Sequence, residues 1–173
     1  MKSKTWVRRY GLIFAATLMI AVIVLAIEMR RPEAVSDDTV VVYKTATCNC
    51  CSKWVDHLRQ DGFSVQVHNE SSLKPIKRKL GVPEVLSSCH TATLGNYVIE
   101  GHVPASDIRR LLAERPAGRG LAVPGMPLGS PGMEQGSRVE PYKTLLFDEQ
   151  GHTSTFSEHG AMQAAPTTLS PAS

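Results

Sequence analysis

The sequence predicts an α/β domain with a central mixed sheet flanked by helices, preceded by an N-terminal hydrophobic helix. Three observations lead to this fold class: an uncharged apolar run at residues 10–27, alternating strand and helix patterns over residues 40–80, and a Gly95-Asn96 turn between two short β-type segments. Strands joined through a helix lie parallel and strands joined by a tight turn lie antiparallel, so we expect a mixed sheet. With 173 residues, 42% of them hydrophobic, the chain can bury one core.

The first part of the domain has a strand–helix–strand pattern. Residues 40–43 are a β-branched run bounded by polar residues, which predicts a buried strand. An apolar stripe at positions i, i+3, i+4 and i+7 then predicts a helix, formed by Cys51, Trp54, Val55 and Leu58. Gly62 follows in the position typical of a helix C-terminus. Residues 63–68 alternate apolar and polar side chains, which predicts a half-buried strand.

The second part has a short helix, a hairpin, another helix and a terminal hairpin. These are predicted at residues 71–80, 89–99, 104–114 and 144–156. The four cations of the first of these helices are expected to face solvent: Lys74, Lys77, Arg78 and Lys79. Residues 117–136 are rich in glycine and proline and are predicted to form one long loop. The order of these elements is the one found in a thioredoxin-like fold.

The N-terminal run divides the chain into regions. Residues 1–31 are predicted to be a signal peptide or a membrane anchor, because basic residues precede an apolar stretch that is close to the minimum length of a membrane-spanning helix. Residues 32–39 are expected to be a linker, and residues 160–173 a disordered tail. In either case residues 40–159 are expected to fold in the periplasm, and the only expected membrane contact is through the N-terminal segment.

The charge distribution argues against nucleic acid as a partner. Six of the 19 Lys and Arg residues lie within the first 31 positions, together with Glu28. The remainder therefore carries 13 basic and 15 acidic side chains, a net charge of −2. Phosphate recognition needs a concentrated cationic surface, which this distribution does not provide.

Three of the four cysteines crowd into one short motif, Cys48-Asn49-Cys50-Cys51. Such short spacings make poor structural disulfides, because a small loop restricts the unfolded chain little. The motif lies at the predicted start of a helix, where unpaired N–H groups lower the pKa of a thiol. Several thiolates within one turn repel one another, which favours a bound soft cation such as Cu(I).

Further ligands are expected from distant segments. If the start of the 89–93 strand faces the helix, Cys89 and His90 could complete the site, with His102 as an additional candidate. Met126 and Met133 lie in the flexible loop and offer thioether ligands that also suit Cu(I). Other interpretations stay open: a dithiol redox pair formed by Cys48 and Cys51, a zinc site, a packing role for the methionines, and a role for Cys89 as a buried apolar residue or disulfide partner.

Four segments, taken together, are similar to the motifs of one known family: Cys48-Asn49-Cys50-Cys51, Ser88-Cys89-His90-Thr91, Glu100-Gly101-His102-Val103-Pro104 and Val123-Pro124-Gly125-Met126-Pro127. They resemble the CopG-like family of small periplasmic proteins that occur with bacterial copper-resistance systems. The resemblance covers residues 40–159. It implies a thioredoxin-like fold, copper bound through the Cys-x-Cys-Cys cysteines, and possible cycling between Cu(I) and Cu(II).

The sequence thus predicts an exported copper-binding domain that sequesters copper or changes its oxidation state in copper resistance, in contact with other periplasmic copper-handling proteins. More than one copper ion can be bridged by three clustered thiolates. A copper oxidoreductase activity is a possible consequence. Two alternatives remain: a thiol–disulfide oxidoreductase in which Cys48 attacks and Cys51 resolves, and a passive copper chaperone.

Overall fold

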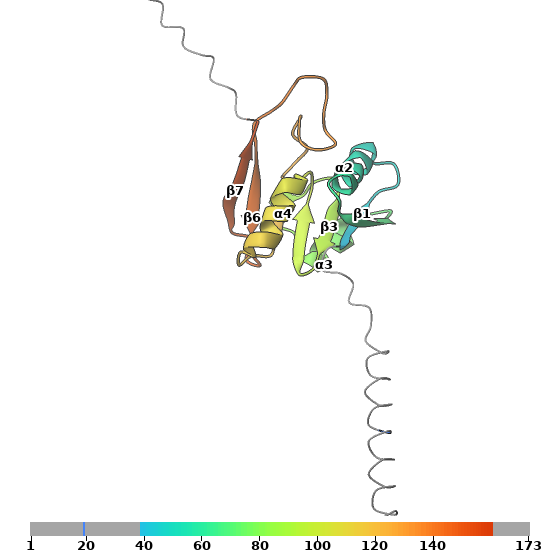
Figure 1. The fold of residues 1–173 in the computed structure, drawn as a ribbon, viewed down its shortest axis with the longest axis vertical. Helices are drawn as coiled ribbons and strands as arrows, with labels where there is room; N and C mark the ends of the chain where they lie inside the picture. The colour runs from blue at the N-terminus through green and yellow to red at the C-terminus, as the bar shows by residue number, and fades with distance from the viewer. Residues whose placement is uncertain (1–18, 20–38, 161–173) are drawn as a thin grey trace, which may run out of the picture. The chain divides into compact units, whose positions relative to one another are not determined.

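The computed structural model describes residue 19 and residues 39–160 (Figure 1). The predicted signal peptide or anchor and the predicted C-terminal tail lie almost wholly outside the described residues, so those boundaries stay predictions. Within the part of the chain that is described, no helix combines the length and apolar character needed to cross a membrane.

Residues 39–160 form a mixed α/β unit with one seven-stranded sheet in the order β2-β1-β3-β4-β5-β6-β7. The strands are β1 (Thr39–Lys44), β2 (Ser64–Asn69), β3 (Thr91–Leu94), β4 (Tyr97–Glu100), β5 (Gly120–Ala122), β6 (Tyr142–Phe147) and β7 (Thr153–His159). The α-helices in this range are α2 (Asn49–Gln60), α3 (Lys74–Leu80) and α4 (Ala105–Glu114), and a 3-10 turn, η1, covers Glu84–Leu86. The mixed α/β class predicted from sequence is therefore confirmed.

The first strand–helix–strand unit has the predicted parallel pairing. β1 pairs with β2 from Thr39 opposite Ser64 to Lys44 opposite Asn69. The side chains of β1 alternate between half-buried and buried positions, as one side of the strand faces the core. The predicted apolar stripe of α2 is buried, and the chain leaves the helix through Gly62 at φ 90°, in the left-handed region.

The remaining strands extend the sheet on the other side of β1. β3 pairs antiparallel with both β1 and β4, around the predicted Gly95-Asn96 turn. α4 then returns the chain so that β5 lies parallel to β4. β6 and β7 form the predicted terminal hairpin, with a register irregularity between Thr144 and Leu145.

The prediction of one uninterrupted loop over residues 117–136 is wrong at its start, because β5 lies within it. β5 has three residues, all buried, which is too short to give a periodic pattern. Gly120 makes the pairing possible: a Cβ atom at this position would lie only 1.8 Å from the Val98 carbonyl oxygen. The backbones of β4 and β5 can approach this closely only with glycine.

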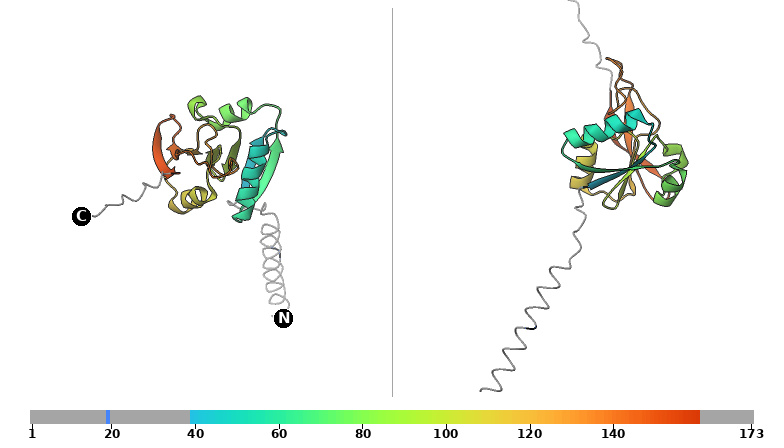
Figure 2. Two further views of the ribbon diagram at one scale, coloured as in Figure 1. Left: turned by 90° about the horizontal axis from the view of Figure 1, so that it is seen from above. Right: turned by 90° about the vertical axis from the view of Figure 1, so that its right-hand side faces the viewer.

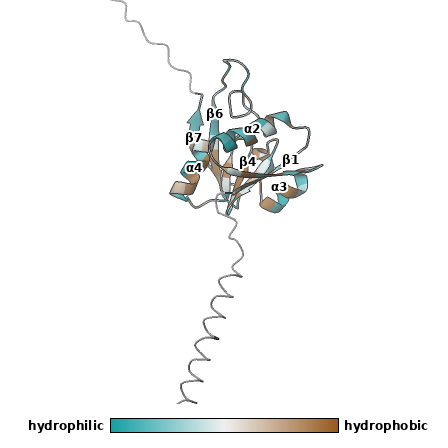
Figure 3. Ribbon diagram, turned by 45° about the vertical axis from the view of Figure 1, so that its right-hand side comes forward, coloured by the Kyte–Doolittle hydropathy of each residue, from teal (hydrophilic) through white to brown (hydrophobic). Residues whose placement is uncertain are grey.

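Two hydrophobic clusters occupy the two faces of the sheet. The larger joins the sheet to α2 and α4 and includes Trp54, Leu58, Ile99, Ile108 and Leu121. The smaller contains Leu86, Val98, Ala122 and Phe147, and Leu80 at the end of α3 packs against it. Accordingly α3 lies on the opposite side of the sheet from α4 (Figure 2). Along the ribbon of α4, hydrophilic and hydrophobic residues alternate (Figure 3), and its buried residues Ala105, Asp107, Ile108 and Leu111 lie at the spacing of an amphipathic helix.

Candidate metal centre

The Cys-x-Cys-Cys motif forms the N-terminus of α2. Cys48 is the N-cap residue, and its Sγ atom accepts a hydrogen bond from the backbone N–H of Cys51 at 3.3 Å. Cys51 is fully buried, whereas Cys48 and Cys50 are half-buried. The motif thus forms the N-cap and first turn of α2, where the helix has unpaired backbone N–H groups and favours negative charge.

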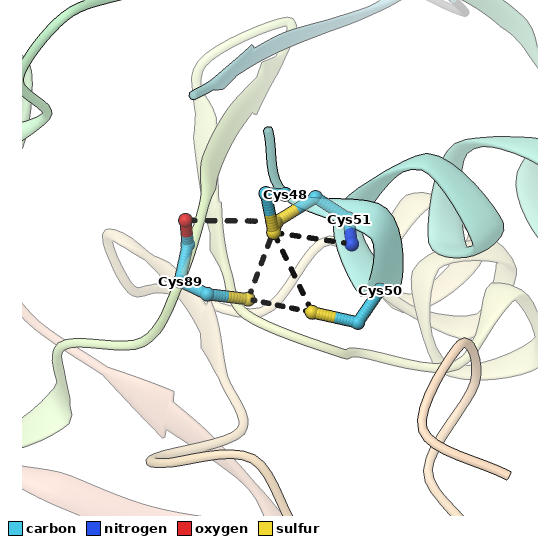
Figure 4. Close-up of side chains that lie close together, drawn as sticks. All are labelled: Cys48, Cys50, Cys51 and Cys89. Carbon is cyan, nitrogen blue, oxygen red and sulfur yellow. Dashed lines mark hydrogen bonds between the residues drawn. A yellow bond between two sulfur atoms is a disulfide. The ribbon is translucent and has the colours of Figure 1, made fainter. Parts of the chain in front are cut away.

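The structure brings the fourth cysteine to this turn (Figure 4). Cys48 and Cys51 are joined by a disulfide, and Cys50 and Cys89 are free thiols. The Cys89 Sγ atom lies 3.5 Å from that of Cys51 and 3.9 Å from that of Cys50, and the Cys50 and Cys48 sulfurs are 3.4 Å apart. All four sulfurs lie within 4.8 Å of one another. Once the Cys48–Cys51 disulfide is reduced, four thiolates at this spacing could bridge one metal ion or a small cluster of ions.

A buried carboxylate fixes the segment that carries Cys89. Glu100, with no exposed surface, accepts hydrogen bonds from the Ser88 backbone N–H at 2.5 Å and from the Thr91 hydroxyl at 2.6 Å, and it pairs with the Lys77 ammonium group. These bonds hold the chain on both sides of Cys89. The expectation that all four cations of α3 face solvent is therefore wrong for Lys77, whose side chain is only 12% exposed.

Gly101 allows this segment to approach the loop after β5. A Cβ atom at Gly101 would lie 2.6 Å from the Val123 carbonyl oxygen and 2.7 Å from Ser88, and the residue has φ 72°. Only glycine satisfies both the close contact and the left-handed backbone. The Ser88 hydroxyl in turn donates a hydrogen bond to the Gly125 carbonyl oxygen, which links the residue before Cys89 to the residue before Met126.

Two fully buried histidines form a second group of candidate ligands around Cys89. The His102 Nε2 atom lies 3.0 Å from Cys89 Sγ, and the His90 Nδ1 atom lies 3.3 Å from it. His102 Nδ1 donates to the Pro131 carbonyl oxygen at 2.8 Å, which leaves the Nε2 lone pair directed at the thiol. A backbone carbonyl that orients the second ring nitrogen in this way is typical of histidines that ligate metals.

His90 has an unsatisfied polar atom. Its ring lies 4.3 Å from the Trp54 ring and 4.9 Å from the His102 ring, and its Nε2 atom has no hydrogen-bond partner. Trp54 is held in turn by a 2.8 Å hydrogen bond from its Nε1 to the Val103 carbonyl oxygen. A buried unpartnered ring nitrogen is rare in folded proteins and marks this ring as a functional candidate.

The surroundings favour uncharged ligands in the metal-free site. Burial, and then the neighbouring Cys50, raise the pKa of the Cys89 thiol to about 12, so that it stays protonated at neutral pH. Burial is also the main cause that lowers the pKa of His90, followed by the nearby His102 and Lys77. The pKa of His102 is lowered mainly by burial. Neutral imidazoles can ligate a metal, and a bound cation would replace the thiol proton.

The glycine-rich loop packs against the same site. A Cβ atom at Gly132 would lie 2.6 Å from the Cys50 carbonyl oxygen and 2.9 Å from the Trp54 backbone nitrogen. The loop therefore sits directly on the first turns of α2. Met126 is 53% exposed and Met133 is half-buried, and their role as ligands stays a prediction.

The other histidines have structural partners. His57 Nε2 accepts a hydrogen bond from the Ala105 N–H at 3.1 Å, so it caps the start of α4. His68 stacks on Tyr43. His159 pairs with Asp107, and His152 with Asp148. Glu100, Lys77 and Trp54, which organise the site, were not identified as site residues from the sequence.

Comparisons with known proteins agree with this description. A family model described as "Protein of unknown function, DUF411" matches residues 86–133, and a search of curated proteins found no match. Two solved structures of a protein named copper resistance protein copG, forms 2 and 1, are each 43% identical to this chain. Their TM-scores are 0.68 and 0.67, and the matches cover 70% of this chain and 98% and 96% of the other chains.

The fold and the site together define the class: an α/β protein that gathers four cysteine sulfurs and two buried imidazoles at the start of a helix. Within this class the relationship is specific, because the 43% identity extends over nearly the full length of the solved structures. The chain belongs to the copper resistance protein CopG family, as the four sequence motifs predicted.

Proposed function

We propose that the protein is an exported copper-binding protein that sequesters copper or cycles it between Cu(I) and Cu(II) in copper resistance. The observation that carries this proposal is the meeting of Cys89 with the Cys-x-Cys-Cys motif, with all four sulfurs within 4.8 Å. Thiolate ligands suit Cu(I) as a soft cation, and the name of the related solved proteins refers to copper resistance. Zinc also binds cysteine-rich sites, but the expected export of the protein and the nearby methionine-bearing loop favour copper over zinc.

The two ligand groups differ in their preferred oxidation state. In the reduced protein, the four thiols can give up their protons and bridge one or more Cu(I) ions. His90 and His102 add nitrogen ligands, which stabilise Cu(II) better than sulfur alone. Since Cys89 belongs to both groups, the ion can stay near one position while its ligand set changes.

The proposal includes a thioredoxin-like fold and a periplasmic location. The parallel β1-α2-β2 unit, the antiparallel β3-β4 pair and α4 support the fold assignment. The basic and apolar residues at positions 1–31 support export, and the Cys48–Cys51 disulfide is compatible with an oxidising compartment.

Copper content tests the proposal. The full-length protein is purified from cells grown with added copper, beside Cys50→Ser and the exposed α3 variant Lys79→Gln. We expect copper in the parent protein and in Lys79→Gln, and a large loss in Cys50→Ser, because that variant keeps a Cys-x-x-Cys pair but not the cluster. Full copper retention in Cys50→Ser would contradict the four-sulfur site.

A thiol–disulfide oxidoreductase is the second candidate, and the Cys48–Cys51 disulfide at a helix N-terminus favours it. Insulin reduction by the metal-free protein separates the two functions. Rapid turnover would favour the dithiol enzyme, whereas slow turnover together with tight copper binding supports the copper protein. A passive copper chaperone would bind Cu(I) but would not undergo reversible oxidation in stopped-flow experiments.

A further inference from the structure

The structure divides the four cysteines into two pairs with different chemistry. Cys48 and Cys51 share a disulfide, and their Cα atoms are 5.4 Å apart, within the usual range for such a bond. Cys50 and Cys89 stay free, with their sulfurs 3.9 Å apart. Both pairs meet at the same turn of α2, so electrons released by one pair arise next to the ligands supplied by the other.

We propose that Cys48 and Cys51 supply the electrons that reduce Cu(II), while Cys50, Cys89 and His102 hold the Cu(I) produced. This inference rests on the proposed copper function and specifies its electron source. Two S–H bonds break and one S–S bond forms. The two electrons reduce two Cu(II) ions to two Cu(I) ions, and the two protons go to solvent.

The electron source and the ligands are adjacent but use different sulfur atoms. The oxidised form shown by the structure keeps Cys89 Sγ within 3.0 Å of His102 Nε2 and 3.3 Å of His90 Nδ1. Forming the Cys48–Cys51 bond therefore leaves a sulfur–nitrogen ligand group intact. His102 is already oriented for this task, because its other ring nitrogen donates to the Pro131 carbonyl oxygen.

A disulfide between other cysteines would not have this property. Cys51 Sγ is also 3.5 Å from Cys89 Sγ, so a Cys51–Cys89 bond is within reach of a modest side-chain rotation. That bond would consume the sulfur that both imidazoles face. The same holds for a Cys50–Cys89 bond, which would consume both remaining thiols. A Cys48–Cys50 bond would spare Cys89 but would consume Cys50. Only the pairing seen in the structure keeps both Cys50 and Cys89 as thiol ligands beside His102.

The experiment counts thiols and copper in the same sample. The full-length chain is reduced, stripped of metal and reductant without oxygen, and mixed with two equivalents of Cu(II). We expect two of the four thiols to disappear, two equivalents of Cu(I) to be detected by a Cu(I)-specific chelator, and peptide mapping to show a Cys48–Cys51 link. Supplying Cu(I) directly, or redox-inactive Zn(II), should consume no thiols.

Cys48→Ser tests the division of roles, and serine should preserve the helix because it is a favoured N-cap residue. In this variant any disulfide must include Cys50 or Cys89, or no disulfide forms. We therefore expect the variant to lose most of the Cu(I) that the parent protein retains after gel filtration of the Cu(II)-treated sample. Circular dichroism checks that the variant is folded. The peptide map of the Cu(II)-treated parent protein shows which two cysteines form the disulfide, and that result does not depend on the variant.

The outcomes distinguish this inference from the proposed function. If Cu(I) binds but Cu(II) leaves all four thiols intact, or if the mapped disulfide contains Cys50 or Cys89, the inference is wrong and the copper function stands. Equal Cu(I) retention by folded Cys48→Ser would also overturn it. If neither Cu(I) nor Cu(II) is bound, the proposed function itself fails.

Discussion

Glu100 determines the position of Cys89 without touching it. The carboxylate is completely buried, and its partners are the Ser88 N–H, the Thr91 hydroxyl and the Lys77 ammonium group. A buried carboxylate is tolerated only when such partners compensate for the loss of water. Because Ser88 precedes Cys89 directly, the hydrogen bonds that compensate for burying the Glu100 charge also fix the position of the candidate ligand Cys89.

Replacing Glu100 with glutamine should destabilise the protein strongly. Lys77 would keep its charge in a largely buried position without a counter-ion, which typically costs about 3–5 kcal/mol. Urea denaturation of the metal-free protein measures the loss. Asp56→Asn is the matched control, because its partner Arg59 is 3.4 Å away and both side chains are more than half exposed, so its loss should stay below about 1 kcal/mol. Similar losses in both variants would show that the buried pair has no special role.

Single residues also show what the sequence can and cannot predict about the site. The Cys-x-Cys-Cys spacing identifies the motif by itself, and the strand pattern places Cys89 and His90 opposite the helix. Glu100 and Lys77 carry no such signal, because a charged residue is usually exposed and their pairing depends on how α3 packs on the sheet. The sequence does not reveal the role of His57 either, because its hydrogen bond with the Ala105 N–H joins two helices that are distant in the chain.

At the scale of the elements, the loop after β5 holds the site against α2. Gly132 lies on the first turns of α2, and the preceding Pro131 accepts the hydrogen bond that orients His102. Both contacts involve backbone atoms, so the loop can be displaced only as a unit. A shift of this loop would therefore change the orientation of the His102 imidazole ring.

Gly132→Ala should weaken copper binding. The new methyl group would meet the Cys50 carbonyl oxygen and the Trp54 nitrogen, which would move Pro131 away from His102. Losing an outer partner of a metal ligand typically lowers metal affinity about 10–100-fold. A competition titration of Cu(I) with a chelator of known affinity measures this change.

Gly136→Ala is the control for that experiment. Gly136 also has a positive φ, at 60°, but a Cβ atom there has nothing within 4 Å. Both variants therefore carry a comparable cost of roughly 1–2 kcal/mol for the left-handed backbone, and only Gly132→Ala adds the contact with α2. Equal Cu(I) affinities of the two variants would mean that the loop does not position His102.

The β6-β7 hairpin is attached to α4 through one buried carboxylate. Asp107, only 5% exposed, accepts hydrogen bonds from Thr144 Oγ1 at 2.6 Å and Ser157 Oγ at 2.7 Å, and lies 2.8 Å from His159 Nε2. Burial, followed by the charges of Asp107 and Glu134, raises the pKa of the adjacent Tyr142 to about 12. The carboxylate thus stabilises the last two strands and changes the titration of a neighbouring tyrosine.

Asp107→Asn should loosen this hairpin and lower the pKa of Tyr142. Each hydrogen bond to a charged group contributes about 1.5–3 kcal/mol, so we expect a loss of stability and faster hydrogen exchange in β6 and β7. The pKa of Tyr142 should fall toward its usual range without reaching it, because burial, the largest cause of the shift, remains. Ultraviolet difference titration against the parent protein measures the shift. The exposed Asp56→Asn on α2 should leave both the hairpin exchange and the tyrosine titration unchanged.

At the scale of the whole molecule, the sequence predicted the mixed sheet but not its continuity. Hydrophobic periodicity identifies the longer strands because each carries several alternating residues. β5 has three buried residues, and without it the β6-β7 hairpin has no partner in the predicted sheet. The missing information is the close approach of Gly120 to Val98, which depends on two segments far apart in the chain.

The site itself exists only in the folded molecule, so copper should stabilise the fold. Residues 48–51 stay together in the unfolded chain, but Cys89 and His102 meet them only after folding. A ligand that binds the native state alone at 1,000 times its Kd stabilises it by about 4 kcal/mol, and binding to the unfolded chain reduces this effect. Thermal unfolding of the reduced protein should therefore shift upward with Cu(I) and return to its starting value when a chelator removes the copper.

Cys89→Ala separates binding from stabilisation. The variant keeps the three-cysteine motif, which can hold Cu(I) in the folded and unfolded chain alike, so bound copper should raise the melting temperature far less than in the parent protein. Lys79→Gln, which changes an exposed side chain of α3, should keep the full increase. If Cys89→Ala gains as much stability from Cu(I) as the parent protein does, the copper is held by the local motif alone. In that case folding would assemble no part of the binding site.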